Sequence, residues 1–365
     1  MKLCIDGFAA SNLPGTNIFS YSKEIITLIN SKDTINPYIL WDRFPLSFYW
    51  DRLENTKFVP LKLDRLSNDY SSIEKFIESN NIDIFHSPND GFSIPKNKCC
   101  QYITTIHSLY PIIYKDNVDE KYLNKFTKMV PYAIEKSDKV IAISPIVKRD
   151  LIKHFNVPED KIKIVYPKCS EIFVPKEDKF CKGFIKRHYN IDYPYILYVG
   201  SIISKKKLDS VINILKESKK KIKDLKLVVI GDISGKRESY YLKIKELIAS
   251  YNLEDSVNFL GIIKQTHLPI FYKSSVCVID LDEYNSYPLS AVEAINSGAI
   301  VVVNKTEINV KVLNKCAVYC DLSQINILAD FIEGIYSNYD YREKILSMIE
   351  KPISSSDENI LSIYD

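Results

Sequence analysis

The segment from Asp280 to Val303, DLDEYNSYPLSAVEAINSGAIVVV, holds the residues whose types and spacing best indicate chemistry. It predicts an acidic loop, a helix that opens near Pro288, and a turn at Gly298 into a β-branched strand. The free N–H groups of a first helical turn and the helix dipole form a site for an anion such as phosphate. Glu293 lies about one and a half turns into this helix, where a carboxylate can accept hydrogen bonds from sugar hydroxyls. Diphosphate and sugar hydroxyls together predict a nucleotide-sugar as the ligand.

The elements that must position this segment alternate between short apolar strands and amphipathic helices in both halves of the chain. This alternation predicts an α/β protein of two doubly wound, parallel-sheet (Rossmann-like) domains that face each other across a cleft. Ligands of such sheets bind beyond the carboxyl ends of the strands. The stretch Tyr166–Lys182 breaks both periodicities and contains Pro167 and Pro175, so it is the predicted linker.

The composition excludes several classes of protein. The 365 residues suffice for two domains, and 46% hydrophobic and 26% charged residues are typical of a soluble globular chain. A net charge of +3 without an arginine-rich arm argues against nucleic acid as a partner. The eight cysteines include no CxxC pair, which predicts reduced thiols in the cytoplasm. No signal peptide is predicted, and no apolar run approaches the roughly 20 residues of a membrane span.

Eight phrases, in their order and spacing, resemble those of retaining GT-B glycosyltransferases of the family-4 type over nearly the whole chain. The phrases are IDGFAASNLPGTNIFSYSKEII, DIFHSPN, TIHSLYPI, SDKVIAISPIVKRDLIKHFNVPEDKIKIVY, ILYVGSIISKKKLDSVI, LVVIGD, VNFLGII and YPLSAVEAINSGAIVVVN. The resemblance implies an acceptor-binding domain at residues 1–170 and a nucleotide-sugar-binding domain at residues 171–345. Residues 346–365 are expected to form a tail helix that packs back on the first domain.

Two residues of the first half have roles that this resemblance implies. Gly15 lies in the loop after the first strand, which in the family faces the donor phosphates and the acceptor; an ordinary turn is the alternative. His107 follows a strand and matches a histidine that contacts the donor sugar, where a neutral imidazole donates to one hydroxyl and accepts from another. Ser108 replaces the family's aspartate, so His107 is expected to lack its charged neighbour. His86 is a weaker candidate for the same cleft.

Basic residues after the strand ILYVG hold the diphosphate in the family. By spacing from Gly200, Lys206 is the best match and Lys205 the second, and an ammonium group would neutralise the leaving diphosphate. Ser201 stands where some members carry arginine, so part of that phosphate contact is expected to be missing. A solvated charge run is the alternative interpretation of the lysines.

The family is marked by two glutamates eight positions apart, and Glu293 matches the second, which binds the ribose. Asn285 occupies the first position. Three interpretations remain open: altered donor choice, use of Glu283 instead, or lost activity. The backbone N–H groups of Ser286 and Tyr287 are expected to bind the phosphates. The donor-binding stretch continues through Pro288 and Leu289.

Asp280 and Asp282 spell DxD, the metal motif of the other glycosyltransferase fold. Since they precede a helix in the second of two sheet domains, we interpret the match as coincidence and expect no metal. The expected substrate is a nucleotide-diphosphate sugar of the UDP or GDP type.

The predicted function is sugar transfer with retention to a glycan, lipid-linked or protein acceptor, in the synthesis of a surface polysaccharide or glycoconjugate. His107, Lys206 and Glu293 are the predicted catalytic residues. A nucleotide-sugar epimerase and a non-catalytic partner subunit of the same fold are the alternatives; Asn285, Ser108 and Ser201 support the latter. The absence of a GxGxxG after any strand argues against a nicotinamide dehydrogenase. The basic segment KESKKKIKDLK predicts either a solvated face or peripheral contact with an anionic membrane, at its inner face.

Overall fold

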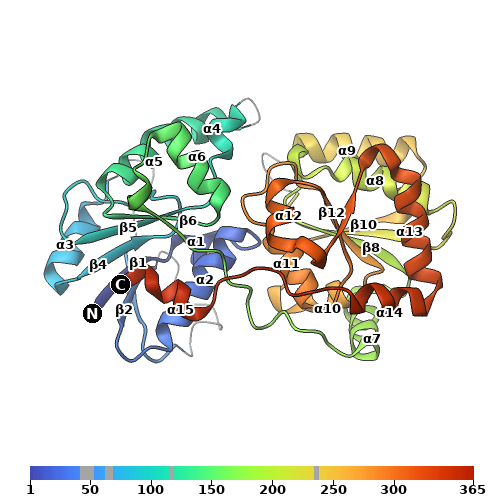
Figure 1. Ribbon diagram of the computed structural model, residues 1–365, viewed down its shortest axis with the longest axis horizontal. Helices are drawn as coiled ribbons and strands as arrows, with labels where there is room; N and C mark the ends of the chain where they lie inside the picture. The colour runs from blue at the N-terminus through green and yellow to red at the C-terminus, as the bar shows by residue number, and fades with distance from the viewer. Residues whose placement is uncertain (42–52, 62–68, 116–117, 234–237) are drawn as a thin grey trace. The chain divides into compact units, whose positions relative to one another are not determined.

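The computed structural model describes residues 1–41, 53–61, 69–115, 118–233 and 238–365, which form two units, each with its own parallel sheet (Figure 1). Unit 1 comprises Met1–Lys168 and Ser354–Asp365, and unit 2 comprises Cys169–Ile353. The α/β class with two parallel sheets, predicted from the alternation of strands and helices, is confirmed.

The sheet of unit 1 has seven strands in the order β3-β2-β1-β4-β5-β6-β7, and each neighbouring pair is parallel. The order reverses between β1 and β4, which makes the sheet doubly wound. Its strands are β1 (Lys2–Asp6), β2 (Asn36–Trp41), β3 (Lys57–Pro60), β4 (Ile84–Ser87), β5 (Gln101–Ile106), β6 (Lys139–Ala142) and β7 (Ile162–Ile164). Its α-helices are α1 (Phe8–Asn12), α2 (Asn17–Asn30), α3 (Ser71–Asn80), α4 (Tyr110–Ile113), α5 (Glu120–Lys136), α6 (Pro145–Phe155) and α15 (Asp357–Leu361).

The sheet of unit 2 has six parallel strands in the order β10-β9-β8-β11-β12-β13, and its order reverses between β8 and β11. Its strands are β8 (Tyr195–Val199), β9 (Lys226–Ile230), β10 (Val257–Gly261), β11 (Cys277–Asp280), β12 (Val301–Asn304) and β13 (Val318–Cys320). Its α-helices are α7 (Asp178–Tyr189), α8 (Leu208–Ser218), α9 (Glu238–Ser250), α10 (Leu268–Ser274), α11 (Leu289–Asn296), α12 (Glu307–Leu313), α13 (Ile325–Ser337) and α14 (Tyr339–Ser347).

Polar residues at helix ends explain several of these boundaries. The Ser144 hydroxyl accepts the N–H of Val147 at 3.3 Å and so caps α6. Ser356 caps α15 in the same way by accepting the N–H of Asn359 at 3.2 Å. Helices α3, α6 and α7 end at asparagines in the left-handed conformation, which asparagine tolerates better than most residues.

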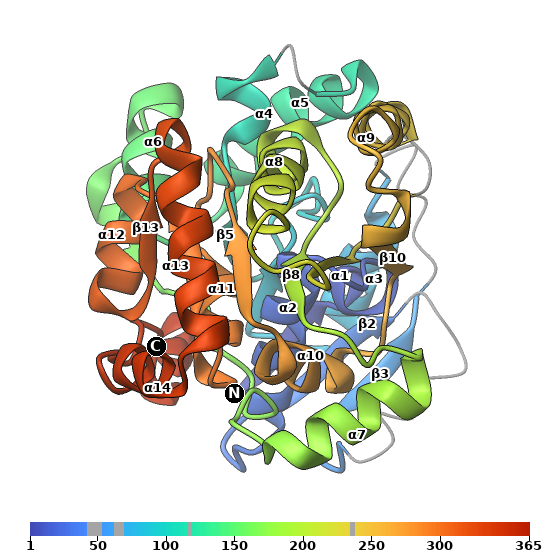
Figure 2. The same cartoon turned by 90° about the vertical axis from the view of Figure 1, so that its right-hand side faces the viewer.

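The core of unit 2 is built from the apolar strands of its sheet and the helices that pack on them. Helices α8, α9 and α13 cover one face of the sheet, and α8 and α13 lie side by side (Figures 1 and 2). Helix α11 packs on β11 and β12. Strands covered on both faces are apolar throughout, so the chemistry of this unit must come from the loops that follow the strands.

The structure corrects one predicted boundary of an element. The predicted linker Tyr166–Lys182 is partly helical, because α7 begins at Asp178. The sequence of α7 is dominated by charged residues, and its buried stripe consists mainly of Cys181 and Ile185. So short an apolar stripe is easily missed in a lysine-rich segment, but it packs α7 against α10.

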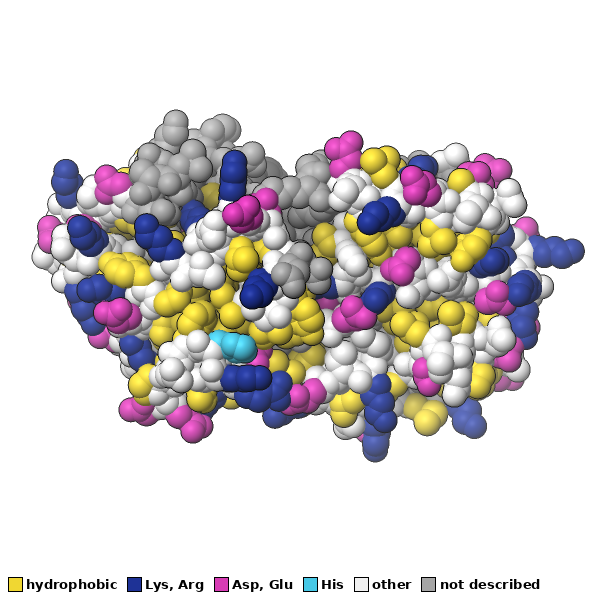
Figure 3. Space-filling view, turned by 90° about the horizontal axis from the view of Figure 1, so that it is seen from above, with side chains coloured by type: hydrophobic (Ala, Val, Ile, Leu, Met, Phe, Trp, Pro, Cys, Tyr) yellow, Lys and Arg dark blue, Asp and Glu magenta, His cyan; other side chains and the backbone are white. Residues whose placement is uncertain are grey.

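The surface carries mixed charge on the face drawn in Figure 3, where Lys and Arg side chains are interspersed with Asp and Glu. Within the described part of the chain, the structure contains no helix with the length and hydrophobicity that crossing a membrane requires. The eight cysteines are free thiols in the structure.

Candidate functional site

The loops after β8 and β11 meet where the strand order of unit 2 reverses, because these two strands are neighbours. Parallel strands bring their carboxyl ends to the same edge, which is where ligands bind in doubly wound sheets. After β8, a short 3₁₀ turn at Ser204–Lys206 carries the predicted lysines. After β11, the chain enters the acidic loop. The backbone N–H of Glu283 donates to the Lys205 carbonyl at 3.0 Å and so joins the two loops.

The predicted phosphate lysines contact the DxD carboxylates. Lys206 Nζ lies 3.2 Å from Asp282 Oδ2 and 3.8 Å from Asp280 Oδ1. Lys205 Nζ lies 3.4 Å from the same Asp282 oxygen and donates to the Tyr284 carbonyl at 3.0 Å. The side chains of Lys206 and Asp282 are only 13% and 4% exposed. The DxD sequence, interpreted above as coincidence, therefore has a role as the ionic partner of the lysines.

A fourth ion pair lies at the exposed edge of this group, where Lys207 Nζ is 2.9 Å from Glu283 Oε1. Glu283 is thus engaged with a lysine, whereas the sequence suggested it as a substitute for the family's first glutamate. We call the following six residues the ion cluster: Lys205, Lys206, Lys207, Asp280, Asp282 and Glu283. Three ammonium groups face three carboxylates, so the formal charge of the cluster is zero.

Glycines shape the loop that carries the lysines. Gly200 has φ +151°, and a Cβ there would lie 3.1 Å from Lys206 Cδ. A Cβ on Gly231 would lie 2.0 Å from the Gly200 carbonyl oxygen, which no side chain tolerates. Ser201 follows in the same loop, and its carbonyl accepts the Tyr198 hydroxyl at 2.9 Å. The loop therefore lies close against β9 and lets the Lys206 stem pass over its backbone.

Burial and charge act in opposite directions on the two buried lysines. Burial alone would lower the pKa of Lys206, but the charges of Asp280 and Asp282 outweigh it and hold that pKa above its usual value. For Lys205, burial lowers the pKa and Asp282 only partly offsets this. Lys206 therefore stays protonated, and it does so because of its two carboxylate partners.

The start of α11 differs from the prediction in two details. Pro288 is the N-cap rather than a member of the first turn, which begins at Leu289. The N–H of Tyr287, predicted to face phosphate, donates to Asn285 Oδ1 at 3.3 Å. The hydroxyl of Ser286 is buried and has no hydrogen bond to any described residue. A ligand at this loop would therefore compete with Asn285 for the Tyr287 N–H. It could also form a hydrogen bond with the Ser286 hydroxyl.

Glu293 is buried in the second turn of α11, the helix whose first turn contacts the ion cluster. Burial raises the pKa of Tyr272 on α10, and the charges of Glu293 and Asp280 raise it further. The Ser290 hydroxyl donates to Asp280 Oδ2 at 2.7 Å and ties the first turn of α11 to the cluster. The structure therefore brings together the lysines, the start of α11 and Glu293, all of unit 2.

In unit 1, His107 is a buried neutral imidazole. Its Nε2 lies 2.7 Å from the Pro88 carbonyl, and because a carbonyl only accepts, Nε2 carries the proton. Burial lowers its pKa to about 4. The Tyr21 ring packs edge-on at 4.8 Å. The prediction that His107 donates to one hydroxyl and accepts from another needs correction, because only Nδ1 is left and it can only accept.

Asp90 places a carboxyl group next to His107, which Ser108 does not. Its Oδ1 accepts the backbone N–H of His107 at 2.8 Å. The residue has φ +51° and is 3% exposed. Burial raises the pKa of Asp90 to about 7, although the hydrogen bond from His107 acts in the other direction.

His86 lies in a buried hydrogen-bond chain rather than at a surface. Its Nε2 pairs with Thr105 Oγ1 at 2.8 Å, and Thr105 also meets the Tyr21 hydroxyl at 3.2 Å. Its Nδ1 pairs with the hydroxyl of Tyr364 at 2.9 Å. Burial lowers the pKa of His86 to about 3. Both ring nitrogens are used, so a ligand role for His86 has no support in this geometry.

Gly15 follows α1, a short helix that the sequence did not predict in the loop after β1. It has φ +79°, and a Cβ would meet nothing within 4 Å. The glycine is therefore needed for the backbone conformation, while Thr16 next to it caps α2 by accepting the N–H of Phe19 at 3.2 Å.

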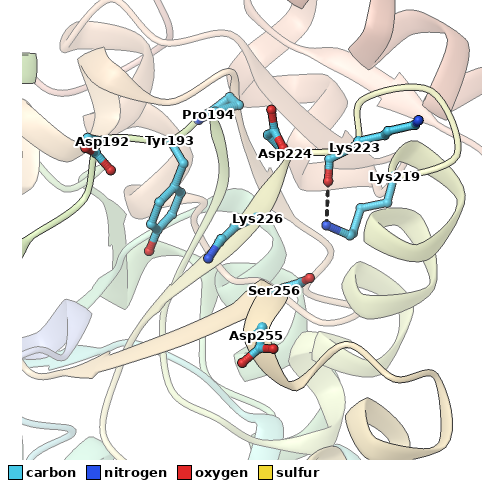
Figure 4. Close-up of a pocket in the computed structure, with 9 residues that line it drawn as sticks. All are labelled: Asp192, Tyr193, Pro194, Lys219, Lys223, Asp224, Lys226, Asp255 and Ser256. Atoms are coloured by element: carbon cyan, nitrogen blue, oxygen red, sulfur yellow. Dashed lines mark hydrogen bonds between the residues drawn. The ribbon is translucent and has the colours of Figure 1, made fainter.

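A pocket of about 460 Å³ in unit 2 lies away from these groups (Figure 4). Its lining residues are Asp192, Tyr193, Pro194, Lys219, Lys223, Asp224, Lys226, Asp255 and Ser256. They lie at or before the first residues of β8, β9 and β10, so the pocket is at the amino edge of the sheet. None of the predicted site residues lines it. Among the described residues, no group of three or more His, Cys, Asp or Glu is arranged to hold a metal ion.

Sequence reasoning missed Asp90, and it named Asp280 and Asp282 without their contacts to the lysines. Asp280, Asp282 and Asp90 each end or follow a strand, and that position was an available signal. No comparable signal pointed to Tyr364, which is 278 positions from its partner His86.

Comparison with protein families matches both halves of the chain. The model described as Glycosyl transferases group 1 matches residues 182–350, and the model described as Glycosyltransferase Family 4 matches residues 47–167. An uncharacterized glycosyltransferase of Methanocaldococcus jannaschii is 26% identical over 266 residues, 69% of this chain and 64% of that protein. The O-antigen chain mannosyltransferase of Salmonella typhimurium is 24% identical over 216 residues, 59% of this chain. The match spans 55% of that relative's own length.

Solved structures of low identity share the fold. Anabaena HepE in complex with UDP and glucose has a TM-score of 0.72 at 13% identity, with 95% of this chain and 92% of that chain covered. A glycosyltransferase from Rickettsia africae has a TM-score of 0.67 at 18% identity, with 100% and 94% covered.

Proposed function

Because the chain belongs to the glycosyltransferases of the group 1 and family 4 type, which have the GT-B fold, we propose that it is a retaining hexosyltransferase. It would move a sugar from a nucleoside-diphosphate sugar to a hydroxyl acceptor, with unit 2 binding the nucleotide and unit 1 the acceptor. One observation carries this proposal: two lysines, the start of α11 and Glu293 converge where the strand order of unit 2 reverses.

In the proposed reaction, the bond from the anomeric carbon to the leaving phosphate oxygen breaks while a bond to the acceptor oxygen forms. The acceptor proton passes to that phosphate oxygen on the same face. Lys206 and Lys205 would neutralise the leaving diphosphate, and Glu293 would accept hydrogen bonds from the ribose. Nδ1 of His107 would accept a hydrogen bond from one sugar hydroxyl. We propose no metal in this scheme, because the lysines and the helix start supply the positive charge.

The names of relatives support a narrower version of the substrate. Two of them are O-antigen chain mannosyltransferases, of Salmonella typhimurium and Escherichia coli, at 24% and 18% identity. Anabaena HepE was solved with UDP-glucose. We therefore propose a UDP- or GDP-linked hexose as donor and a glycan, lipid-linked or protein acceptor in surface polysaccharide synthesis. Such work would take place in the cytoplasm, at the inner face of the membrane.

Thermal stabilisation by a panel of UDP- and GDP-sugars tests the proposal. A donor at a hundred times its Kd adds about 2.7 kcal/mol to the stability of the unit that binds it, so its Tm should rise by several degrees. The stabilising donors are then assayed for transfer and for slow hydrolysis. A panel that produces no shift, together with no transfer, would overturn the proposal.

A non-catalytic partner subunit is a second candidate, favoured by the contact between Asn285 and the Tyr287 N–H, which occupies a group predicted for phosphate. Calorimetry with UDP and GDP separates the two candidates. An enzyme binds a nucleotide and turns over its sugar, whereas a scaffold that lost donor chemistry does neither.

A further inference from the structure

The acidic half of the ion cluster has no role in the reaction proposed above. A site for a diphosphate needs positive charge, yet every ammonium group of the cluster already faces a carboxylate. Asp280 and Asp282 lie at the buried end of the cluster, where charges interact more strongly than at the exposed pair of Lys207 and Glu283.

We propose that Asp282, assisted by Asp280, is a built-in counter-ion that competes with the diphosphate for Lys205 and Lys206. The carboxylate neutralises the lysines before the donor arrives and recaptures them when the nucleoside diphosphate leaves. This inference rests on the proposed function and describes how the same site sets its affinity.

The position of Asp282 suits this role because its two oxygens have separate partners. Oδ1 accepts the N–H of Tyr284 at 3.2 Å, and Oδ2 faces both lysines at 3.2 and 3.4 Å. The backbone carbonyl of Asp282 accepts the Asn304 amide at 3.0 Å. The carboxylate is thus fixed to the loop, whereas the flexible lysine stems can turn toward a ligand.

The same contacts explain why a carboxylate would be useful in a phosphate site. Burial lowers the pKa of Lys205 and the neighbouring Lys206 lowers it further, so two buried ammonium groups side by side tend to lose charge. The aspartates keep Lys206 charged and in place without a ligand. Their negative charge also repels the diphosphate and so weakens its binding. Weaker binding speeds release of the product, a step that limits turnover in many enzymes.

Calorimetric titration of UDP and GDP into the full chain and into Asp282→Asn tests the inference at fixed ionic strength. Asparagine keeps an oxygen for the Tyr284 N–H and replaces the charged oxygen that faces the lysines by an uncharged NH2 group. We expect Kd to fall about tenfold or more in Asp282→Asn, since a charge a few ångströms from the phosphates is removed. Asp280→Asn should give a smaller fall, because Asp280 is farther from Lys206.

Asp192→Asn is the matched control. It changes net charge by the same amount at an exposed pair with Lys186, at the amino edge of the same sheet. It should leave Kd unchanged, and equal tightening in this control would overturn the inference. If Asp282→Asn does not fold, as judged by thermal denaturation, Asp282→Ser is titrated in its place and interpreted in the same way.

The outcomes separate the inference from the proposed function. Wild-type binding with an unchanged or weaker Kd in the Asp282 variant overturns the counter-ion and leaves the proposed function standing. Failure of the wild type and all variants to bind either nucleotide overturns both. Tighter binding with slower turnover at saturating donor supports both.

Discussion

The two units prepare their candidate residues by different physical means. In unit 2, Lys206 keeps its charge because two carboxylates lie within 3.2 and 3.8 Å. In unit 1, burial keeps His107 and His86 neutral by lowering their pKa values to about 4 and about 3. The difference shows that a buried polar group can be stabilised either by an opposite charge or by neutral hydrogen bonds.

This contrast fits the chemistry proposed for each unit. A leaving diphosphate gains negative charge and calls for cations, whereas an uncharged sugar hydroxyl needs a hydrogen-bond acceptor of fixed orientation. Variants of the two units should therefore respond differently to salt and to pH, and the following experiments test that expectation.

The largest effect is expected from Lys206→Ala. Loss of its ammonium should reduce transfer by at least about tenfold, equivalent to about 1.4 kcal/mol of barrier. Steady-state rates at about 50 and about 300 mM salt are the measurement, and the wild type should lose more rate with salt than the variant. Lys186→Ala, at a surface pair, is the control. A wild-type rate in Lys206→Ala would contradict the view that unit 2 acts through charge and unit 1 through neutral hydrogen bonds.

Glu293→Ala should also reduce transfer by at least about tenfold, since the buried carboxylate beside Tyr272 is lost. Glu293→Gln keeps an acceptor oxygen and should lose less. Measurement of kcat and KM for the donor distinguishes binding from chemistry. Wild-type kcat and KM in both variants would refute the proposed hydrogen bond from the ribose to Glu293.

His107→Phe should slow transfer by about fivefold, about 1 kcal/mol, because one neutral hydrogen bond is lost. Since the pKa of His107 is about 4, the wild-type rate should show no histidine step between about pH 5.5 and 8. A pH–rate profile of both proteins checks this. A step near pH 6.5 that disappears in the variant would show that His107 titrates normally and would break the contrast between the units.

Asp90→Asn should stabilise the protein at high pH. The folded pKa is about 7, against roughly 4 for an unfolded aspartate, so the folded state binds more protons between these values. The contribution of Asp90 to stability therefore falls as the pH rises from about 4 to 7. The introduced amide oxygen can still accept the His107 N–H, so Tm should exceed wild type by about 2 °C or more at pH 8 and by little at about pH 4.5. Equal differences at both pH values would contradict the raised pKa.

Tyr364→Phe should have the smallest effect on transfer. It removes only the hydroxyl that pairs with His86 Nδ1 and leaves that buried nitrogen unpaired, at about 1–3 kcal/mol of stability. Thermal denaturation should show a lower Tm, with transfer within about twofold of wild type. Tyr336→Phe, at a half-exposed tyrosine of α13, is the control.

The fold could be predicted well because periodicity is a local property. The alternation of apolar strands and amphipathic helices, which predicted the two parallel sheets, can be seen in any short stretch of sequence, such as β1, β8 or α6. Helix α7 was missed because its charged residues hide a short apolar stripe. Local sequence therefore indicates where a strand ends and a loop begins, but it underestimates helices with little buried surface.

The candidate site could be predicted only in part, because partners depend on pairs that are distant in sequence. The sequence indicated Lys206 and Glu293 by position, and their roles remain predictions. It could not show that the loops after β8 and β11 join lysine to aspartate, 76 positions apart for Lys206 and Asp282. Nor could it show that the Pro88 carbonyl fixes the His107 tautomer, since that requires the packed geometry.

Residues 354–365 belong to unit 1, although the whole of unit 2 separates them from residue 168. Lys139 Nζ donates to the carbonyls of Ile363 and Asp365 at 2.9 and 2.8 Å, and Lys168 pairs with Asp357 at 2.7 Å. On the ribosome, the unit that is synthesised first therefore waits for its last segment, roughly ten seconds or more at about 5–20 residues per second. During this interval the imidazole of His86 lacks its phenol partner, and chaperones would meet an unfinished first unit while the second is still being synthesised.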